Sequence, residues 1–147
     1  MNLRSAPRRS AVAEGIYGLL NPIPFGCFVA ALIFDIIYAE TAVMMWNKGA
    51  AWLIFFGLLF AVVPRLLNMM QVWITCRAAA TRTDQLDFWL NLIAIVVAIV
   101  NAFVHSRDAY AVVPTGAWLS ACTVVLLSLG HVLIALQRAA RGGYVHE

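Results

Sequence analysis

Four long apolar stretches most constrain what this chain of 147 residues can fold into. They run roughly over residues 23–46, 50–74, 86–104 and 116–136. A helix needs about 20 predominantly apolar residues to cross about 30 Å of hydrocarbon, because it rises about 1.5 Å per residue. Each stretch meets that length. The sequence therefore predicts an all-α, polytopic membrane protein, a bundle of four transmembrane helices.

Composition supports a lipid environment. Hydrophobic residues make up 63% of the chain and charged residues only 12%, whereas about a quarter of the residues in a soluble domain are charged. So small a body cannot hide the excess in its core, because much of its surface stays exposed. We expect one transmembrane domain over residues 23–136. An interfacial segment, residues 1–22, precedes it, and a short tail, residues 137–147, follows.

The distribution of basic residues predicts the orientation of the bundle. Lysine and arginine near the ends of spans gather on the cytoplasmic side of a membrane. One side of the predicted bundle carries seven of them: Arg4, Arg8, Arg9, Arg77, Arg82, Arg138 and Arg141. The other side carries Lys48 and Arg107. Both termini are therefore expected in the cytoplasm. The chain has no clustered basic domain, so we expect the lipid bilayer and other membrane proteins as partners, and no nucleic acid.

Each span has one face of small and polar residues, as the closed interior of a membrane bundle requires. The periodicity places these residues inward: Pro24, Phe28, Ala31, Asp35, Tyr38 and Ala42; Gly57, Ala61, Pro64, Arg65, Asn68, Gln71 and Thr75; Asn91, Ala94, Ala98, Asn101 and His105; Ser120, Thr123, His131 and Arg138.

Two of the inward residues are charged and lie near the middle of adjoining spans. An isolated charge at that depth costs about 2.5–3.5 kcal/mol on insertion scales. Asp35 on the first span and Arg65 on the second are therefore predicted to form a buried ion pair. Pro64 bends the helix where the guanidinium would emerge. A substrate or proton site at these two residues is the alternative.

Three further polar residues, Asn68, Asn91 and His131, fall in the cytoplasmic half. They are expected to form interhelical hydrogen bonds, and the alternative is that they bind a quinone or haem. His105 and His131 lie at different depths, so one haem cannot take both as axial ligands. No metal-ligand spacing, phosphate-binding loop or nucleophile-and-base pattern occurs. We therefore predict no metal, no catalytic residues and no resident cofactor.

The chain resembles a family of predicted bacterial four-helix membrane proteins of unknown function. Members open their first span with a His-Pro…His-Phe-Pro stretch, and Asn21-Pro22-Ile23-Pro24-Phe25-Gly26 stands there in this chain. Asn91, Arg107 and Gly142-Gly143-Tyr144-Val145-His146 resemble later features. Asn21 and Gly26 replace the family's histidines, so no role of those histidines carries over. Some relatives occur beside quinoprotein sugar dehydrogenases, which implies a redox-linked membrane partner.

Taken together, these patterns favour a non-catalytic accessory or structural subunit of a larger complex in the bacterial inner membrane. A quinone- or haem-binding electron-transfer protein is the main alternative. A small transporter is the weaker one: four-helix multidrug exporters depend on an acidic residue in their first span, but Glu40 lies nearer the span's end than theirs does.

Overall fold

A computed structural model describes residues 22–75, 82–107 and 112–143. Within these ranges the side chains of residues 63–75, 82–84, 138 and 141–143 are not described. The described residues form four helices and no strand: α2 (Pro22–Thr41), α3 (Met44–Thr75), α4 (Arg82–His105) and α5 (Thr115–Gly143). All four contain segments long and apolar enough to cross a membrane: Pro22–Thr41, Met44–Val62, Gln85–His105 and Thr115–Gln137. The prediction of an all-helical fold with four helices able to span a membrane is confirmed for the described residues.

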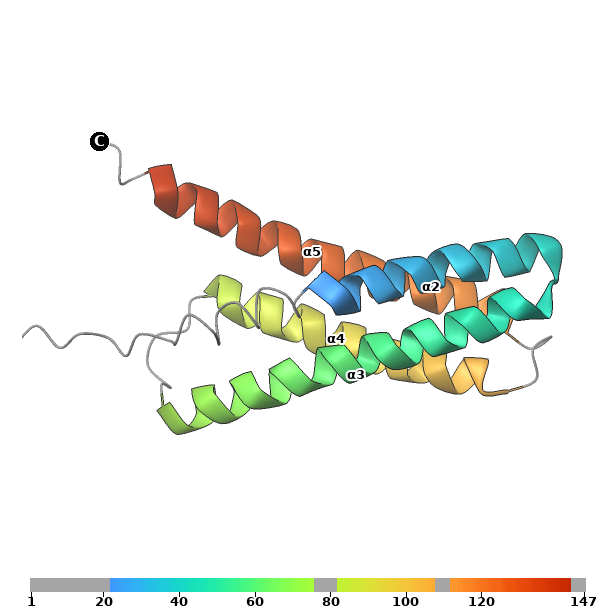
Figure 1. Cartoon of the computed structure of the whole chain (residues 1–147). Helices are drawn as coiled ribbons and strands as arrows, with labels where there is room; N and C mark the ends of the chain where they lie inside the picture. Colours follow the sequence, from blue (N-terminus) through green and yellow to red (C-terminus); the bar gives the residue numbers. More distant parts are fainter. Residues whose placement is uncertain (1–21, 76–81, 108–111, 144–147) are drawn as a thin grey trace, which may run out of the picture.

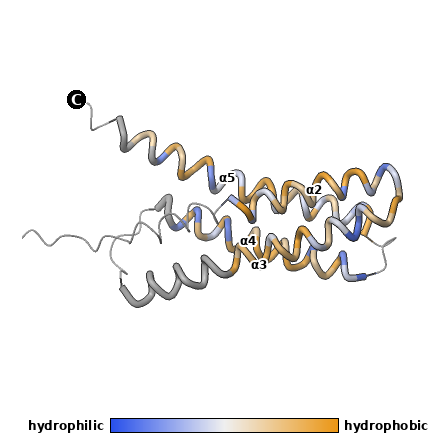
Figure 2. Tube along the Cα trace, in the orientation of Figure 1, coloured by the Kyte–Doolittle hydropathy of each residue, from blue (hydrophilic) through white to orange (hydrophobic). Residues whose placement is uncertain are grey.

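The helices form two antiparallel hairpins, α2–α3 and α4–α5, which pack side by side (Figure 1). Helix α2 also packs against α5, and α3 against α4. We call the end that holds the α2–α3 turn and the α4–α5 connection the hairpin end, and the opposite end the terminal end. Towards the terminal end, α5 diverges from the other helices (Figure 1). Figure 2 shows that hydrophobic residues dominate all four helices over their shared length.

The turn between α2 and α3 is shorter and comes earlier in the chain than the sequence predicts. Helix α2 ends at Thr41 and α3 begins at Met44, whereas the first apolar stretch was expected to run to Trp46. Ala42 takes a left-handed conformation with φ 53°, and its N–H donates to the carbonyl of Tyr38 over 2.8 Å. This is a common way to end a helix, because the reversed residue satisfies a free carbonyl of the last turn. Asp35 consequently lies six residues from the helix end rather than in mid-span.

The inward faces largely agree with the periodicity. On α2 the buried residues are Phe28, Ala31, Asp35 and Tyr38, and on α4 they are Asn91, Ala94, Ala98, Asn101 and His105. Both sets were predicted to face inward. An apolar core of Phe28, Ala31, Ile54, Ala94, Ala98 and Leu127 fills the middle of the bundle. Ala42 and His131 are exceptions, because both were predicted to face inward and both are exposed.

Candidate functional site

Four polar side chains from three helices meet near the hairpin end. Asp35 comes from α2, Asn101 and His105 from α4, and Ser120 from α5; we call them the buried polar cluster. Nε2 of His105 lies 2.7 Å from Oδ1 of Asp35, and the Ser120 hydroxyl donates to Oδ2 of Asp35 over 2.5 Å. The amide of Asn101 donates to Oγ of Ser120 over 2.7 Å. The cluster therefore connects the α2–α3 hairpin to the α4–α5 hairpin.

The cluster is sealed from its surroundings. The side chains of His105 and Asp35 are 0% and 1% exposed, and Asn101 and Ser120 are buried as well. A carboxyl group in a transmembrane segment is costly unless it is paired and hydrogen-bonded. Here both oxygens of Asp35 have partners. The arrangement stabilises the helix packing and leaves the carboxyl group no contact with lipid.

Aspartate, histidine and serine also make up many hydrolase active sites, but their order here is different. In a hydrolase the histidine lies between the serine and the aspartate and takes the serine's proton. In this bundle Asp35 lies in the middle, and the Ser120 hydroxyl donates to Asp35. The His105 ring bonds to Asp35 and to the carbonyl of Asn101 and therefore makes no hydrogen bond to Ser120. The geometry is that of a structural or proton-holding group.

A glycine on α5 makes room for the His105 ring. A Cβ atom at Gly116 would lie 2.9 Å from Cε1 of His105 and 2.5 Å from Cγ1 of Val112. Both distances are too short for carbon atoms in van der Waals contact. The ring also bonds to its own helix, because Nδ1 lies 3.0 Å from the carbonyl oxygen of Asn101. These contacts hold His105 against Asp35.

The predicted partner of Asp35 lies outside the described side chains. Arg65 is on α3, but its side chain is among those not described, so the Asp35–Arg65 pair stays a prediction. The register of the hairpin disfavours it. Phe34 lies against Gly49 and Phe28 against Gly57. Arg65 is 16 residues beyond Gly49, which corresponds to about 24 Å along the helix axis.

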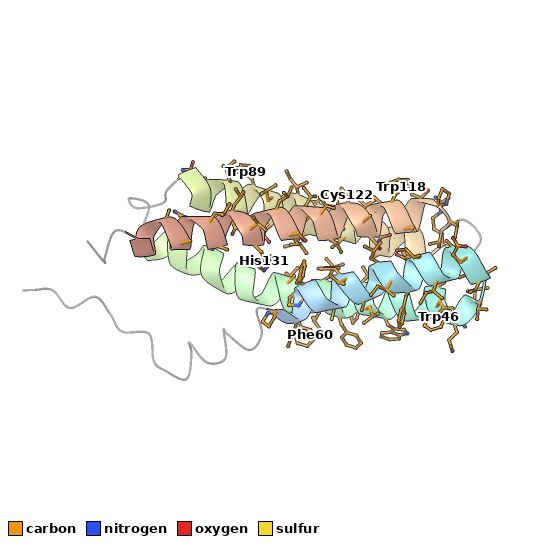
Figure 3. The ribbon with its side chains drawn as sticks, turned by 90° about the horizontal axis from the view of Figure 1, so that it is seen from above. Trp46, Phe60, Trp89, Trp118, Cys122 and His131 are labelled. Carbon is orange, nitrogen blue, oxygen red and sulfur yellow. The ribbon has the colours of Figure 1, made fainter. Side chains whose placement is uncertain are left out.

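The three residues predicted around a cofactor lie in different surroundings. Asn91 is buried, and its amide donates to the carbonyl and to Oδ1 of Asp87, each over 2.8 Å. His131 is exposed and lies beside Phe25, with ring centroids 5.3 Å apart; Figure 3 shows it between α5 and α2. The side chain of Asn68 is not described. A cofactor site formed by these three residues therefore stays a prediction.

A contact between α4 and α5 near the terminal end was not anticipated. A Cβ atom at Gly130 would lie 2.8 Å from Oδ1 of Asp87 and 3.3 Å from Nδ2 of Asn91. Helix α5 can approach Asp87 and Asn91 this closely because Gly130 has no side chain. The spacing of Asp87 and Asn91, four residues apart on one helix, is the sequence signal that points to the pair.

His105 and Ser120 are the other missed residues. The periodicity predicts that both face inward, but it does not bring them to Asp35, because the predicted first span extends to residue 46, five residues beyond the end of α2. Among the described residues, no group of three or more histidine, cysteine, aspartate or glutamate side chains lies close enough to hold a metal ion.

Residues 16–144 match the model of a family described as predicted membrane protein (DUF2231). The match covers most of the chain and agrees with the resemblance noted in the sequence. No curated protein and no solved structure matches the chain.

Proposed function

The chain belongs to the DUF2231 family of predicted membrane proteins, and we propose that it serves as a non-catalytic accessory or structural subunit of a larger complex in the bacterial inner membrane. The observation that carries this proposal is the closed buried polar cluster. Asp35, Asn101, His105 and Ser120 bond to one another and are shielded from a substrate. The exterior of the described helices is left to contact lipid and other proteins.

An aromatic patch on α3 supports a protein partner. Trp52, Phe55 and Phe56 are all exposed, and their ring centroids lie 5.6 to 6.0 Å apart. Trp52 lies eight residues into α3, about 12 Å along the axis, which is deep for a residue that only anchors a helix at the membrane surface. Aromatic side chains are enriched where proteins meet. The association of some relatives with quinoprotein sugar dehydrogenases leads us to expect a redox-linked partner.

Purification in mild detergent tests the proposal. We expect the tagged chain to bring another membrane protein with it at a fixed ratio, measured by quantitative mass spectrometry. Replacing Trp52 and Phe56 by leucine should lower that ratio several-fold. The same replacement of Trp118, which is exposed on α5, serves as the matched control and should leave it unchanged. A chain that purifies alone as a stable monomer would contradict an accessory role.

Binding of a quinone or haem at His131 is the second candidate. Nδ1 of His131 lies 2.8 Å from the carbonyl oxygen of Leu127, so Nδ1 carries the proton and Nε2 is a free acceptor in the neutral ring. Nε2 could accept a hydrogen bond from a quinol or ligate a haem iron. His105 cannot be a second ligand, because it is buried against Asp35 at the other end of the bundle.

A spectrum and a lipid extract test this candidate. A haem ligated by His131 would give a Soret band that the His131→Leu variant loses. A quinone would co-purify with the wild-type chain and not with that variant. His105→Gln serves as the control, since it alters a buried histidine at the hairpin end. Equal quinone content and no Soret band in all three proteins would rule the candidate out.

A further inference from the structure

The hydrogen bonds of His105 determine where its protons lie. Nδ1 is 3.0 Å from the carbonyl oxygen of Asn101, which can only accept. Nδ1 must therefore carry a proton and donate it. The other ring nitrogen, Nε2, faces Oδ1 of Asp35 at 2.7 Å. Two lone pairs at this distance would repel each other, so a second proton must lie between Nε2 and Oδ1.

This second proton can occupy either of two positions. It resides on Nε2, which gives an imidazolium beside a carboxylate, or on Oδ1, which gives a neutral imidazole beside a carboxylic acid. Either way the Asp35–His105 pair has no net charge. Ser120 donates to Oδ2 of Asp35 in both arrangements. We propose that the buried polar cluster is a binding site for one proton, and that this proton keeps the pair neutral within the membrane.

The site is closer to one side of the membrane. His105 is the last residue of α4, and the exposed residues Ser106 and Arg107 follow it. In the opposite direction the apolar core, which includes Ala94, Ala98 and Leu127, separates the cluster from the terminal end. On α5 the buried Thr123 lies one turn beyond Ser120 in this direction, and its hydroxyl donates to the carbonyl of Leu119 on its own helix. The shorter route between the cluster and an aqueous phase therefore leads to the hairpin end.

Few other titratable groups lie near the site in the described part of the chain. Helix α2 contributes the buried Tyr38, one turn from Asp35, and the exposed Glu40. The exposed charges nearest the hairpin end on the other elements are Lys48 on α3 and Arg107 after α4. Helix α5 contributes the Ser120 hydroxyl and, on its exposed side, Cys122. Exposed charges are screened by water and salt, so the Asp35–His105 pair dominates the proton balance of the cluster.

A double-variant cycle in the full-length protein tests the proposal. His105→Gln removes the ring that shares the proton and leaves Asp35 without its neutralising partner. We expect the midpoint of thermal unfolding at neutral pH to fall on the order of 5 °C. Adding Asp35→Asn removes the ionisable group and leaves two amides able to bond. The double variant should therefore recover at least half of the loss. A double variant no more stable than His105→Gln would overturn the proposal.

Infrared and nitrogen NMR spectra of the wild-type protein give a second test, which reads the protonation states directly. Two states agree with the proposal: carboxylic acid with neutral imidazole, or carboxylate with imidazolium. Isotope-labelled histidine identifies His105 through its loss in His105→Gln, and His131 serves as the internal control. A carboxylate on Asp35 beside a neutral His105 ring at neutral pH would contradict the shared proton.

Discussion

At the scale of single residues, Ser120 connects two otherwise separate polar groups. Its hydroxyl donates to Asp35 and accepts from Asn101. A buried polar atom that loses its partner costs about 1–3 kcal/mol, more than the hydrogen bond itself contributes. A small side chain on α5 therefore supplies a hydrogen-bond partner both to a carboxyl group on α2 and to an amide nitrogen on α4.

Replacing Ser120 by alanine should destabilise the bundle by about 1–3 kcal/mol, because Oδ2 of Asp35 and Nδ2 of Asn101 each lose a partner. The free energy of unfolding in detergent measures this. Ser128→Ala is the matched control, since its hydroxyl donates only to the carbonyl of Val124 on its own helix. The control should change stability by no more than about 0.5 kcal/mol. Equal losses in both variants would show that the cluster contributes nothing through Ser120.

At the scale of helices, two local features set how closely and in which register they pack. Gly116 lets α5 lie against the ring of His105. The left-handed backbone conformation of Ala42 ends α2 and therefore sets the level at which Asp35 meets the other helices.

Replacing Gly116 by alanine should destabilise the protein by about 1–3 kcal/mol, as is usual when a methyl group is forced into a packed interior. The added carbon displaces Val112 and the His105 ring, so thermal unfolding should begin at a lower temperature. Gly26→Ala is the control, because no atom lies within 4 Å of a Cβ atom built there. If Gly116→Ala were as stable as Gly26→Ala, the close contact with His105 would be wrong.

Glycine in place of Ala42 should stabilise the turn. A left-handed backbone costs a residue with a Cβ atom about 1–2 kcal/mol, and glycine largely escapes this cost. We expect a gain on the order of 1 kcal/mol in the free energy of unfolding. Ala39→Gly, three residues earlier and exposed on α2, should instead lose about 1 kcal/mol. A loss in both variants would contradict the assigned turn.

At the scale of the whole molecule, an even number of spans predicts that both termini lie on one side of the membrane. The seven basic residues on that side, against two on the other, predict that it is the cytoplasm. The hairpin end, with the proton site, would then face the outer side.

Reporter fusions measure this orientation. Alkaline phosphatase inserted after Arg107 should be active, because the enzyme folds only outside the cytoplasm. A fluorescent protein fused after Glu147 should fluoresce, because it matures inside. As controls, the two reporters are exchanged. Alkaline phosphatase after Glu147 should be inactive, and the fluorescent protein after Arg107 should not fluoresce. The reverse pattern would show that the basic residues do not determine the orientation.

The local features of this protein could be predicted from the order of its residues. The four spans follow from hydropathy, and the buried faces of α2 and α4 follow from helical periodicity, because both depend on residues close together in the chain. Phe28, Ala31 and Asp35 were placed inward for this reason, as were Ala94, Ala98 and Asn101.

Which polar groups meet depends on how the helices pack against one another. The partners of Asp35 depend on the level of each helix along the bundle, and the turn at Ala42 moved Asp35 away from the level expected for Arg65. His131 shares the predicted inward sector of α5 but is exposed, because α5 diverges from its neighbours towards the terminal end (Figure 1). Helical periodicity gives the direction in which a side chain points about the axis of its helix. The register and divergence of neighbouring helices depend instead on contacts between residues far apart in the chain.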